Sequence, residues 1–191
     1  MEDAGTLATE REGPTSERDE ELALAARTDP EAFGLLYERH RLAVFRYLRT
    51  RTRSEDDAGE LTAVVFERAL TAIPRYRPTG GGVAAWLIRI ARNAAVDSGR
   101  RATPVPLAGD VTDGIGSNAP EERVLADEVT SSLMAAVNNL PPVQREAIAL
   151  RYAAGLTARE IGEVLGKSDQ ATQKLLSRAL ATIRETHRVD I

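Results

Sequence analysis

A stretch without apolar periodicity divides the chain at residues 102–120. Its sequence, ATPVPLAGDVTDGIGSNAP, is rich in Pro, Gly, Asp and Ser and offers no face that could pack against a core. Amphipathic helical patterns lie on both sides of it. Because this composition can continue neither pattern, we interpret residues 102–120 as a flexible linker between two small domains.

The composition of the flanking regions favours helices. Ala, Leu, Arg and Glu are abundant, aromatic residues make up 4% of the chain, and no long alternation of β-branched and aromatic residues indicates a sheet. We therefore expect an all-α fold, with one helical domain at residues 19–101 and another at 121–191. Residues 1–18 are polar, acidic and without periodicity, and we expect them to form a disordered tail.

Local signals set the helix boundaries of the first domain. Asp29 and Pro30 are typical of an N-cap and the first helical position, and Ser54 with Asp57 resembles a capping box. Gly99 is a natural C-terminal stop. The predicted helices are residues 19–27, a helix from Pro30, a helix from Ser54 to Pro74, and, after a Pro- and Gly-rich loop at 75–82, an apolar helix from Val83 to about Ser98.

The second domain contains a helix-turn-helix pattern. After helices predicted at 121–140 and 143–153, residues 157–179 read TAREIGEVLGKSDQATQKLLSRA. Thr157 and Glu160 form a capping box that begins a short helix. Gly162 stands where two helices must cross closely, and Gly166 stands where the turn needs a backbone angle that most residues resist. This order of elements is what a helix-turn-helix requires.

The last helix is predicted to keep a polar face outward. Leu176, Ala179, Leu180 and Ile183 repeat at helical spacing and predict its inner face. A helix of this width fits the DNA major groove, where Gln, Lys and Arg reach base edges or phosphates. An ordinary helical hairpin with a solvated polar face is the alternative. The outward positions are Asp169, Gln170, Gln173, Lys174, Ser177 and Arg178, and Ser168 caps the helix.

Charge and residue content restrict the function further. The formal net charge is −4, with acid concentrated in the first 21 residues and arginines concentrated in 75–101. This distribution suits a protein that a larger partner carries to DNA. The chain has no cysteine and two histidines, so we expect no metal site, no cofactor and no enzymatic activity. No signal peptide or membrane-spanning run is evident, which predicts a cytoplasmic protein.

Two sets of motifs together resemble a known family. Residues 140–185, LPPVQREAIALRYAAGLTAREIGEVLGKSDQATQKLLSRALATIRE, are similar to the promoter-reading region of extracytoplasmic-function (ECF) sigma factors of bacterial RNA polymerase. The segments DPEAFGLLYERH, DDAGELTAVVFERAL and AAWLIRIARNAAVD, followed by Gly99-Arg-Arg101, are similar to their other conserved region. The resemblance covers roughly residues 20–185, with the linker in the expected place.

The resemblance implies a factor that binds core RNA polymerase, recognises a promoter and helps to open it. Region 2 of the family corresponds to 19–101 and region 4 to 121–191. An anti-sigma protein that holds the chain inactive, in some cases at the membrane, is an expected partner. The implied polymerase-binding residues are Asp57, Glu60, Leu61, Val64 and Phe66. The implied −10 DNA-binding residues are Pro78, Thr79, Gly80, Arg89, Arg92, Asn93, Asp97, Arg100 and Arg101. The implied −35 DNA-binding residues are Ser168, Gln170, Gln173, Lys174, Ser177 and Arg178.

The chain departs from the family pattern at two places. Ala63-Val64 stands where the family often has Gln-Glu, which removes polar contacts from the polymerase-binding helix. Gln170, Gln173 and Leu175 stand where small or basic residues are common, so a promoter sequence does not transfer from other members.

Two other classes of protein remain as alternatives. An autonomous helix-turn-helix regulator with a helical sensory domain would dimerise and bind an operator without polymerase. A helical adaptor would not bind DNA at all, and a helical hydrolase is the weakest alternative because no nucleophile, metal set or carboxylate pair is evident. His40 and Trp86 are predicted to pack in the core. The arginines at 39–53 suit either a solvated helix face or a contact with polymerase or DNA.

Overall fold

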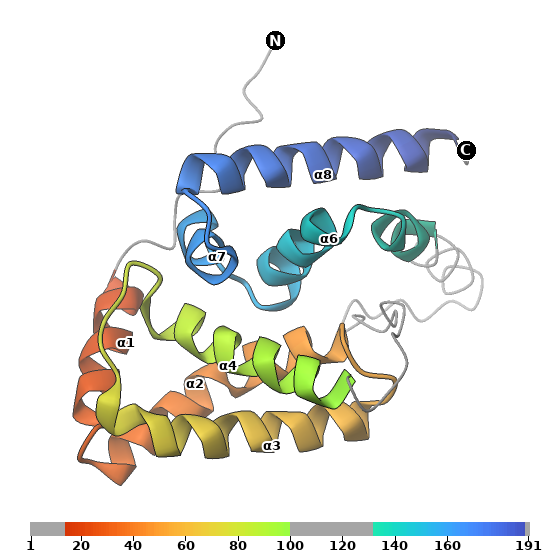
Figure 1. Cartoon of the computed structure of the whole chain (residues 1–191). Helices are drawn as coiled ribbons and strands as arrows, with labels where there is room; N and C mark the ends of the chain where they lie inside the picture. Colours follow the sequence, from red (N-terminus) through yellow and green to blue (C-terminus); the bar gives the residue numbers. More distant parts are fainter. Residues whose placement is uncertain (1–13, 100–131, 190–191) are drawn as a thin grey trace, which may run out of the picture.

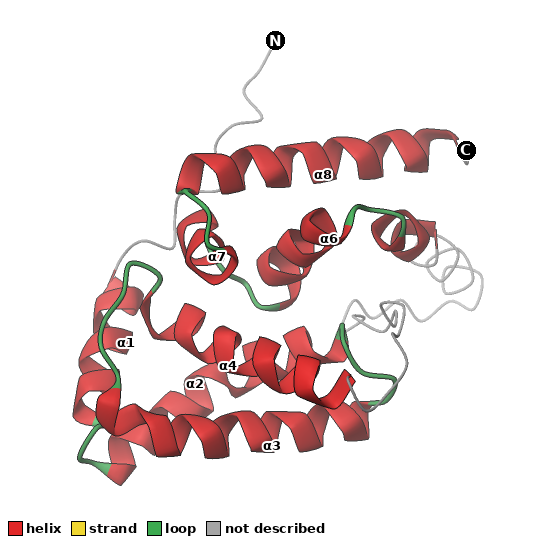
Figure 2. Cartoon of the chain, in the orientation of Figure 1, coloured by secondary structure: helices red, strands yellow, loops and turns green. Residues whose placement is uncertain are grey.

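The computed structural model describes residues 14–99 and 132–189, and their regular structure is helical (Figure 2). The described helices form two layers, with α1 to α4 in one and α6 to α8 in the other (Figure 1). The expectation of an all-α fold is thus confirmed. The predicted linker at 102–120, most of the predicted tail, Arg100 and Arg101 lie outside the described residues.

The N-terminal layer follows the predicted helices closely. It comprises α1 (Pro14–Ala25), α2 (Pro30–Arg49), α3 (Glu55–Ala72), the short 3-10 helix η1 (Ile73–Arg75) and α4 (Gly82–Gly99). Asp29 and Ser54 are confirmed as N-caps, because the Asp29 carboxylate accepts the Glu31 N–H at 2.9 Å and the Ser54 hydroxyl accepts the Asp57 N–H at 3.0 Å.

The first helix corrects one boundary. We predicted disorder up to residue 18 and a helix from residue 19, but α1 already begins at Pro14. Proline is compatible with the first helical position, and a tertiary contact stabilises the helix farther along. Asp19 lies 2.5 Å from Nη1 of Arg39 and 3.3 Å from Nε2 of His40, so α1 is joined to α2. Local sequence could not reveal this contact.

The C-terminal layer contains the predicted helix-turn-helix and one irregularity. Residues 132–138 are helical, followed by α6 (Pro142–Ile148), the π-helical segment η2 (Ala149–Ala153), α7 (Ala158–Leu165) and α8 (Asp169–Val189). The helix predicted at 143–153 thus widens into a π-helix halfway along. Gly155 then reverses the chain with φ 72°.

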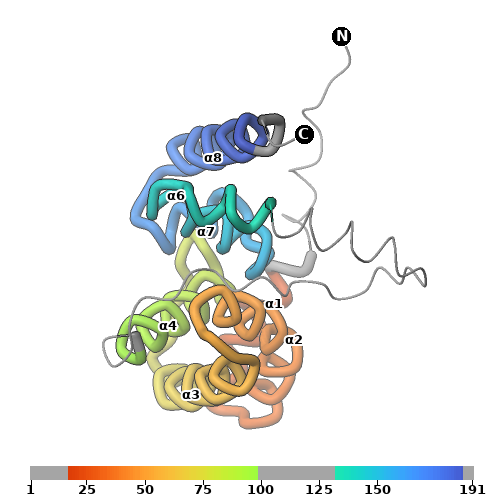
Figure 3. Tube along the Cα trace, turned by 90° about the vertical axis from the view of Figure 1, so that its right-hand side faces the viewer, coloured from red at the N-terminus to blue at the C-terminus, as the bar shows by residue number. Residues whose placement is uncertain are grey.

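The two layers share a hydrophobic core. The larger cluster contains Tyr47, Leu87 and Ile88 of the N-terminal layer together with Leu150 and Ile161 of the C-terminal layer, all at most 2% exposed. Helix α7 packs on α4, and Figures 1 and 3 show this layer resting on the N-terminal bundle. A smaller cluster joins α8 to the rest of the C-terminal layer. The expected separate domains therefore pack together as one body in this structure.

Candidate nucleic-acid interface

The turn of the helix-turn-helix is built as the sequence predicts. The Thr157 hydroxyl accepts the Glu160 N–H at 3.3 Å, and the Glu160 carboxylate accepts the Thr157 N–H at 2.6 Å. This reciprocal pair completes the capping box. Gly166 ends α7 in the left-handed region with φ 65°, a conformation that costs a residue with a side chain more than it costs glycine.

Gly162 lets α7 and α8 cross closely. An added Cβ at this position would lie 2.7 Å from the Lys167 carbonyl oxygen and 3.2 Å from the Thr172 hydroxyl. Thr172 itself is fully buried in the crossing. The prediction that a larger side chain would collide here is confirmed, since the nearest atom belongs to the backbone and cannot rotate away.

Helix α8 presents a polar outer face. Ser168 caps it by accepting the Ala171 N–H at 3.2 Å. Ala179 and Ile183 are buried on its inner face, whereas Leu176 and Leu180 are half-buried against the smaller cluster. The outward orientation of the predicted −35 residues is confirmed, because all of them are exposed: Ser168, Gln170, Gln173, Lys174, Ser177 and Arg178.

The predicted polymerase-binding helix is α3, and it requires one correction. Asp57 and Glu60 are exposed, and Leu61 and Val64 are half-buried, so these residues are accessible along the helix. Phe66 is 5% exposed and packs edge-on against Tyr37, with ring centroids 4.8 Å apart. Its side chain belongs to the core and is not a surface contact, because helical spacing turns it to the inner face.

The predicted −10 residues lie on the loop before α4 and along α4. Pro78, Thr79 and Gly80 are exposed, but the adjacent Gly81 is buried beneath α7. An added Cβ at Gly81 would lie 2.7 Å from Cβ of Glu163, so the C-terminal layer sits directly on this loop. On α4, Arg92, Asn93 and Asp97 are exposed and Arg89 is half-buried. The carboxylate of Asp97 accepts a hydrogen bond from Arg68 at 3.0 Å.

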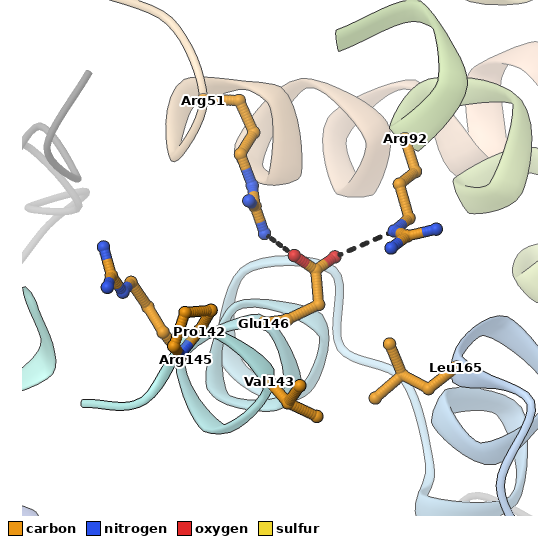
Figure 4. A pocket seen from close by; sticks show the side chains of 7 residues that line it. All are labelled: Arg51, Arg92, Pro142, Val143, Arg145, Glu146 and Leu165. Carbon is orange, nitrogen blue, oxygen red and sulfur yellow. Dashed lines mark hydrogen bonds and ion pairs between the residues drawn. The ribbon is translucent and has the colours of Figure 1, made fainter. Parts of the chain in front are cut away.

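A charged contact that the sequence analysis missed joins the layers beside α4 (Figure 4). Glu146 of α6 has a side chain only 11% exposed. Its Oε1 accepts a hydrogen bond from the Tyr47 hydroxyl at 2.8 Å and lies 3.7 Å from Nε of Arg92, while its Oε2 pairs with Arg51. The partners Arg51 and Glu146 are 95 residues apart, and no local pattern marks such a pair.

Other arginines at 39–53 differ in their surroundings, so a solvated face describes only some of them. Arg39 pairs with Asp19, Arg41 pairs with Glu38 at 3.0 Å, and Arg49 is 9% exposed. His40 is 8% exposed, and Trp86 is half-buried with its ring centroid 5.1 Å from that of Tyr76. These two are packed, as the helical spacing predicts.

Burial and hydrogen bonding shift the pKa values of three groups near these contacts. Burial raises the pKa of the Tyr47 hydroxyl, and its bond to Glu146 acts in the same direction. Burial also raises the pKa of Tyr76, helped by its bond to Glu20. For Asp19, burial acts upward, but the hydrogen bonds from His40 and Arg39 outweigh it and leave the pKa below 3.8. Both tyrosines are therefore neutral hydrogen-bond donors at ordinary pH.

Neither metal ligation nor membrane insertion is supported by the described part of the chain. Residues 14–99 and 132–189 contain no group of His, Asp or Glu side chains placed to hold a metal ion. None of the helices in these ranges combines the length and apolar character that crossing a membrane requires.

Comparison with known proteins identifies the family. The family model of Sigma-70 region 2 matches residues 36–104, and that of Sigma-70 region 4 matches residues 130–183. A relative, the ECF RNA polymerase sigma factor ShbA of Streptomyces griseus, is 37% identical over 161 residues, which cover 78% of this chain and 84% of ShbA. The chain belongs to the ECF sigma factor family.

Other relatives agree with this assignment. BldN of Streptomyces coelicolor, also an ECF RNA polymerase sigma factor, is 34% identical over 158 residues, which cover 81% of this chain and 60% of BldN. The chain thus spans about three fifths of that protein. Among solved structures, CnrH in complex with the cytosolic domain of CnrY is similar with a TM-score of 0.65 and 26% identity, over 91% of this chain and 99% of CnrH.

Proposed function

We propose that this ECF sigma factor binds core RNA polymerase through α3, reads a −35 element with α8, and captures the opened −10 element with α4 and the loop before it. The observation that carries the proposal is the outer face of α8. It places Gln170, Gln173, Lys174 and Arg178 in solvent on a helix whose start is fixed by Ser168 and whose crossing is fixed by Gly162. Side chains of these types recognise base edges and phosphates in the major groove.

The polymerase contact in this proposal is the exposed side of α3. Asp57 and Glu60 supply charge, and Leu61 and Val64 supply apolar surface beside them. The adjacent Ala63 is exposed and adds no polar group. Because Phe66 is buried, it takes no direct part. A mixed polar and apolar strip of this kind is typical of protein interfaces.

The layers must separate for both promoter elements to be read at once. The −10 and −35 elements lie about 25 base pairs apart, which is about 85 Å at about 3.4 Å per base pair. A compact chain of this length has a radius of gyration of about 16 Å. The docked arrangement therefore cannot reach both elements, and the proposed function requires a second, extended arrangement on polymerase.

We also propose a cytoplasmic location and regulation by a protein partner. CnrH was solved in complex with the cytosolic domain of CnrY, and CnrH resembles this chain over nearly its whole length. An anti-sigma protein that holds the two DNA-reading regions inactive is the partner we expect, and no enzymatic step is needed for either role.

Co-purification of the chain with bacterial core RNA polymerase, followed by run-off transcription from a promoter library, tests the proposal. A stable complex that starts transcripts which core enzyme alone does not start is the expected result. Asp57→Ala combined with Glu60→Ala should weaken co-purification, whereas the matched pair Glu21→Ala and Glu185→Ala, also exposed but outside α3, should not. Specific DNA binding with no affinity for core enzyme would instead establish an autonomous helix-turn-helix regulator.

A further inference from the structure

Glu146 lies in an unusual position for a carboxylate of the C-terminal layer. It projects from α6 toward the N-terminal layer, where its contacts are Tyr47, Arg51 and Arg92 (Figure 4). The guanidinium carbon of Arg51 also lies 5.2 Å from the centre of the Tyr47 ring, which helps to hold this arginine in place. The Glu146 carboxylate of the C-terminal layer therefore lies between two arginines of the N-terminal layer.

The surroundings of Glu146 carry more positive than negative charge. A pocket of about 340 Å³ is lined by Arg51, Arg92, Arg145 and Glu146, with apolar walls. In the described part of the chain, Nε of Arg51 and Nε of Arg145 are buried without a hydrogen-bond partner. Buried donors without partners are costly, so the pocket has spare capacity for an anion.

We propose that Arg51 and Arg92 form a binding site for a backbone phosphate of promoter DNA, and that the Glu146 carboxylate occupies this site when the layers are docked. Guanidinium groups bind carboxylates and phosphates with the same forked geometry, so one group can stand in for the other. Docking of the C-terminal layer and binding of DNA at this site therefore exclude each other. The choice of DNA rests on the proposed function.

The position of Arg92 favours DNA over another source of phosphate. Arg92 lies on α4, one turn after Arg89, and both belong to the helix proposed to face the −10 element. Its side chain is 48% exposed, so a strand that follows α4 can reach it. Arg51 lies two residues after the end of α2, and its side chain is 30% exposed. A continuous strand suits this line of cations better than a small free anion does.

The end of the loop proposed to capture the −10 element is covered in the same docked arrangement. Gly81 is buried against Glu163 of α7, and Gly80 lies near Arg159 of the same helix. Separation of the layers would therefore uncover this part of the loop together with the two arginines. The contact of Glu146 with the two arginines and the contact of α7 with the loop therefore form and break together.

The first arm of the test measures docking in the full chain. Because the chain has no cysteine, Leu70→Cys in α3 and Arg184→Cys in α8 allow two dyes to be attached at exposed positions. Glu146→Gln keeps the size of the side chain but leaves two arginines without a counter-charge. Energy transfer between the dyes should fall in Glu146→Gln and stay at the wild-type value in Glu38→Gln. The latter is a matched control, since it removes the same charge and frees Arg41 on an exposed surface.

The second arm measures binding to a labelled duplex of about 30 base pairs without polymerase. Glu146→Gln should bind about five-fold or more tightly than Glu38→Gln, with a salt dependence steeper by about one unit, because one phosphate contact adds about 0.9. Arg51→Glu should also undock the layers, by repelling Glu146, but should bind DNA no more tightly than wild type. This variant separates opening from phosphate binding.

Three results would overturn the proposal. Glu146→Gln that stays docked would show that the carboxylate does not hold the layers. Glu146→Gln that opens but binds the duplex no better than Glu38→Gln would show that the arginines do not bind phosphate. Inorganic phosphate alone that undocks the wild-type chain as well as the duplex does would assign the site to a free anion. No arm uses polymerase, so a failure here is distinguishable from a failure to bind core enzyme.

Discussion

Helices α4 and α8 are both proposed to meet DNA, yet they are built in opposite ways. Helix α4 packs against α1, α2 and α3 and also against α7, and it is apolar on most sides, with Val83, Leu87 and Ile88 almost fully buried. Helix α8 packs against α6 and α7 along one stripe and leaves a broad polar face in solvent. The number of faces of a helix that carry apolar residues thus indicates on how many sides it packs against other helices.

The difference shows which DNA-reading surface is free in the docked arrangement. The outer face of α8 is exposed as it stands, whereas the loop before α4 lies partly beneath α7 and Arg92 faces Glu146. In this arrangement the proposed −35 reader is free, whereas the proposed −10 reader is partly covered. The predictions below test that contrast, from the largest expected effect to the smallest.

Ile161→Ala should destabilise both layers, because this fully buried side chain belongs to the shared cluster. The expected loss is about 2–5 kcal/mol. Trp86, the single tryptophan, lies in α4 and reports the N-terminal layer during urea unfolding. Ile183→Ala is the matched control, since it lies in the smaller cluster and should shift the Trp86 transition much less. Equal shifts would mean that the two clusters unfold as one.

Gly162→Ala and Gly59→Ala should change stability in opposite directions. The added methyl group at 162 meets a backbone oxygen at 2.7 Å, which should cost about 1–3 kcal/mol. Gly59 lies within α3 with nothing within 4 Å of an added Cβ, so alanine there should stabilise by about 0.5–1 kcal/mol. Thermal unfolding followed by circular dichroism measures both. A stable Gly162→Ala protein would place the α7–α8 crossing elsewhere.

Lys174→Ala and Arg178→Ala should weaken transcription without changing stability, because both side chains are exposed on α8. Each should cost about 1–3 kcal/mol of DNA-binding free energy, which is about five-fold to about 100-fold. Run-off transcription with saturating core enzyme measures the effect. Arg184→Ala, exposed farther along the same helix, should leave transcription at the wild-type level. Loss of folding in either test variant would contradict the orientation of α8.

Lowering the pH should weaken the contact between α1 and α2, because it protonates Asp19. Its folded-state pKa is lowered below 3.8, so the stability that it contributes is present above pH 3.8 and is lost as pH falls through the folded-state value. Asp19→Asn should remove this part of the acid dependence, whereas Asp56→Asn, at an exposed position on α3, should retain it. Unfolding midpoints at several acidic pH values measure the difference, which should be the smallest of these effects.

Much of the candidate nucleic-acid interface could be predicted from short-range patterns in the sequence. The Thr157–Glu160 capping box, the Gly166 turn and the exposed face of α8 each depend on residues within one or two helical turns, so the sequence contains the whole cause. The contact of Asp19 with α2 and the ring contact of Phe66 with Tyr37 join different helices instead. Neither is visible in a local window.

The sequence by itself determined most of the helices, their N-caps and the close crossing at Gly162. Those features arise from backbone conformation and from side-chain periodicity, which act over a few residues. Only the tertiary structure decided that the two layers share a core, that α7 covers Gly81 and that Glu146 reaches Arg51 and Arg92. These contacts join residues far apart in the chain, and no periodic pattern records which of many exposed charges will meet.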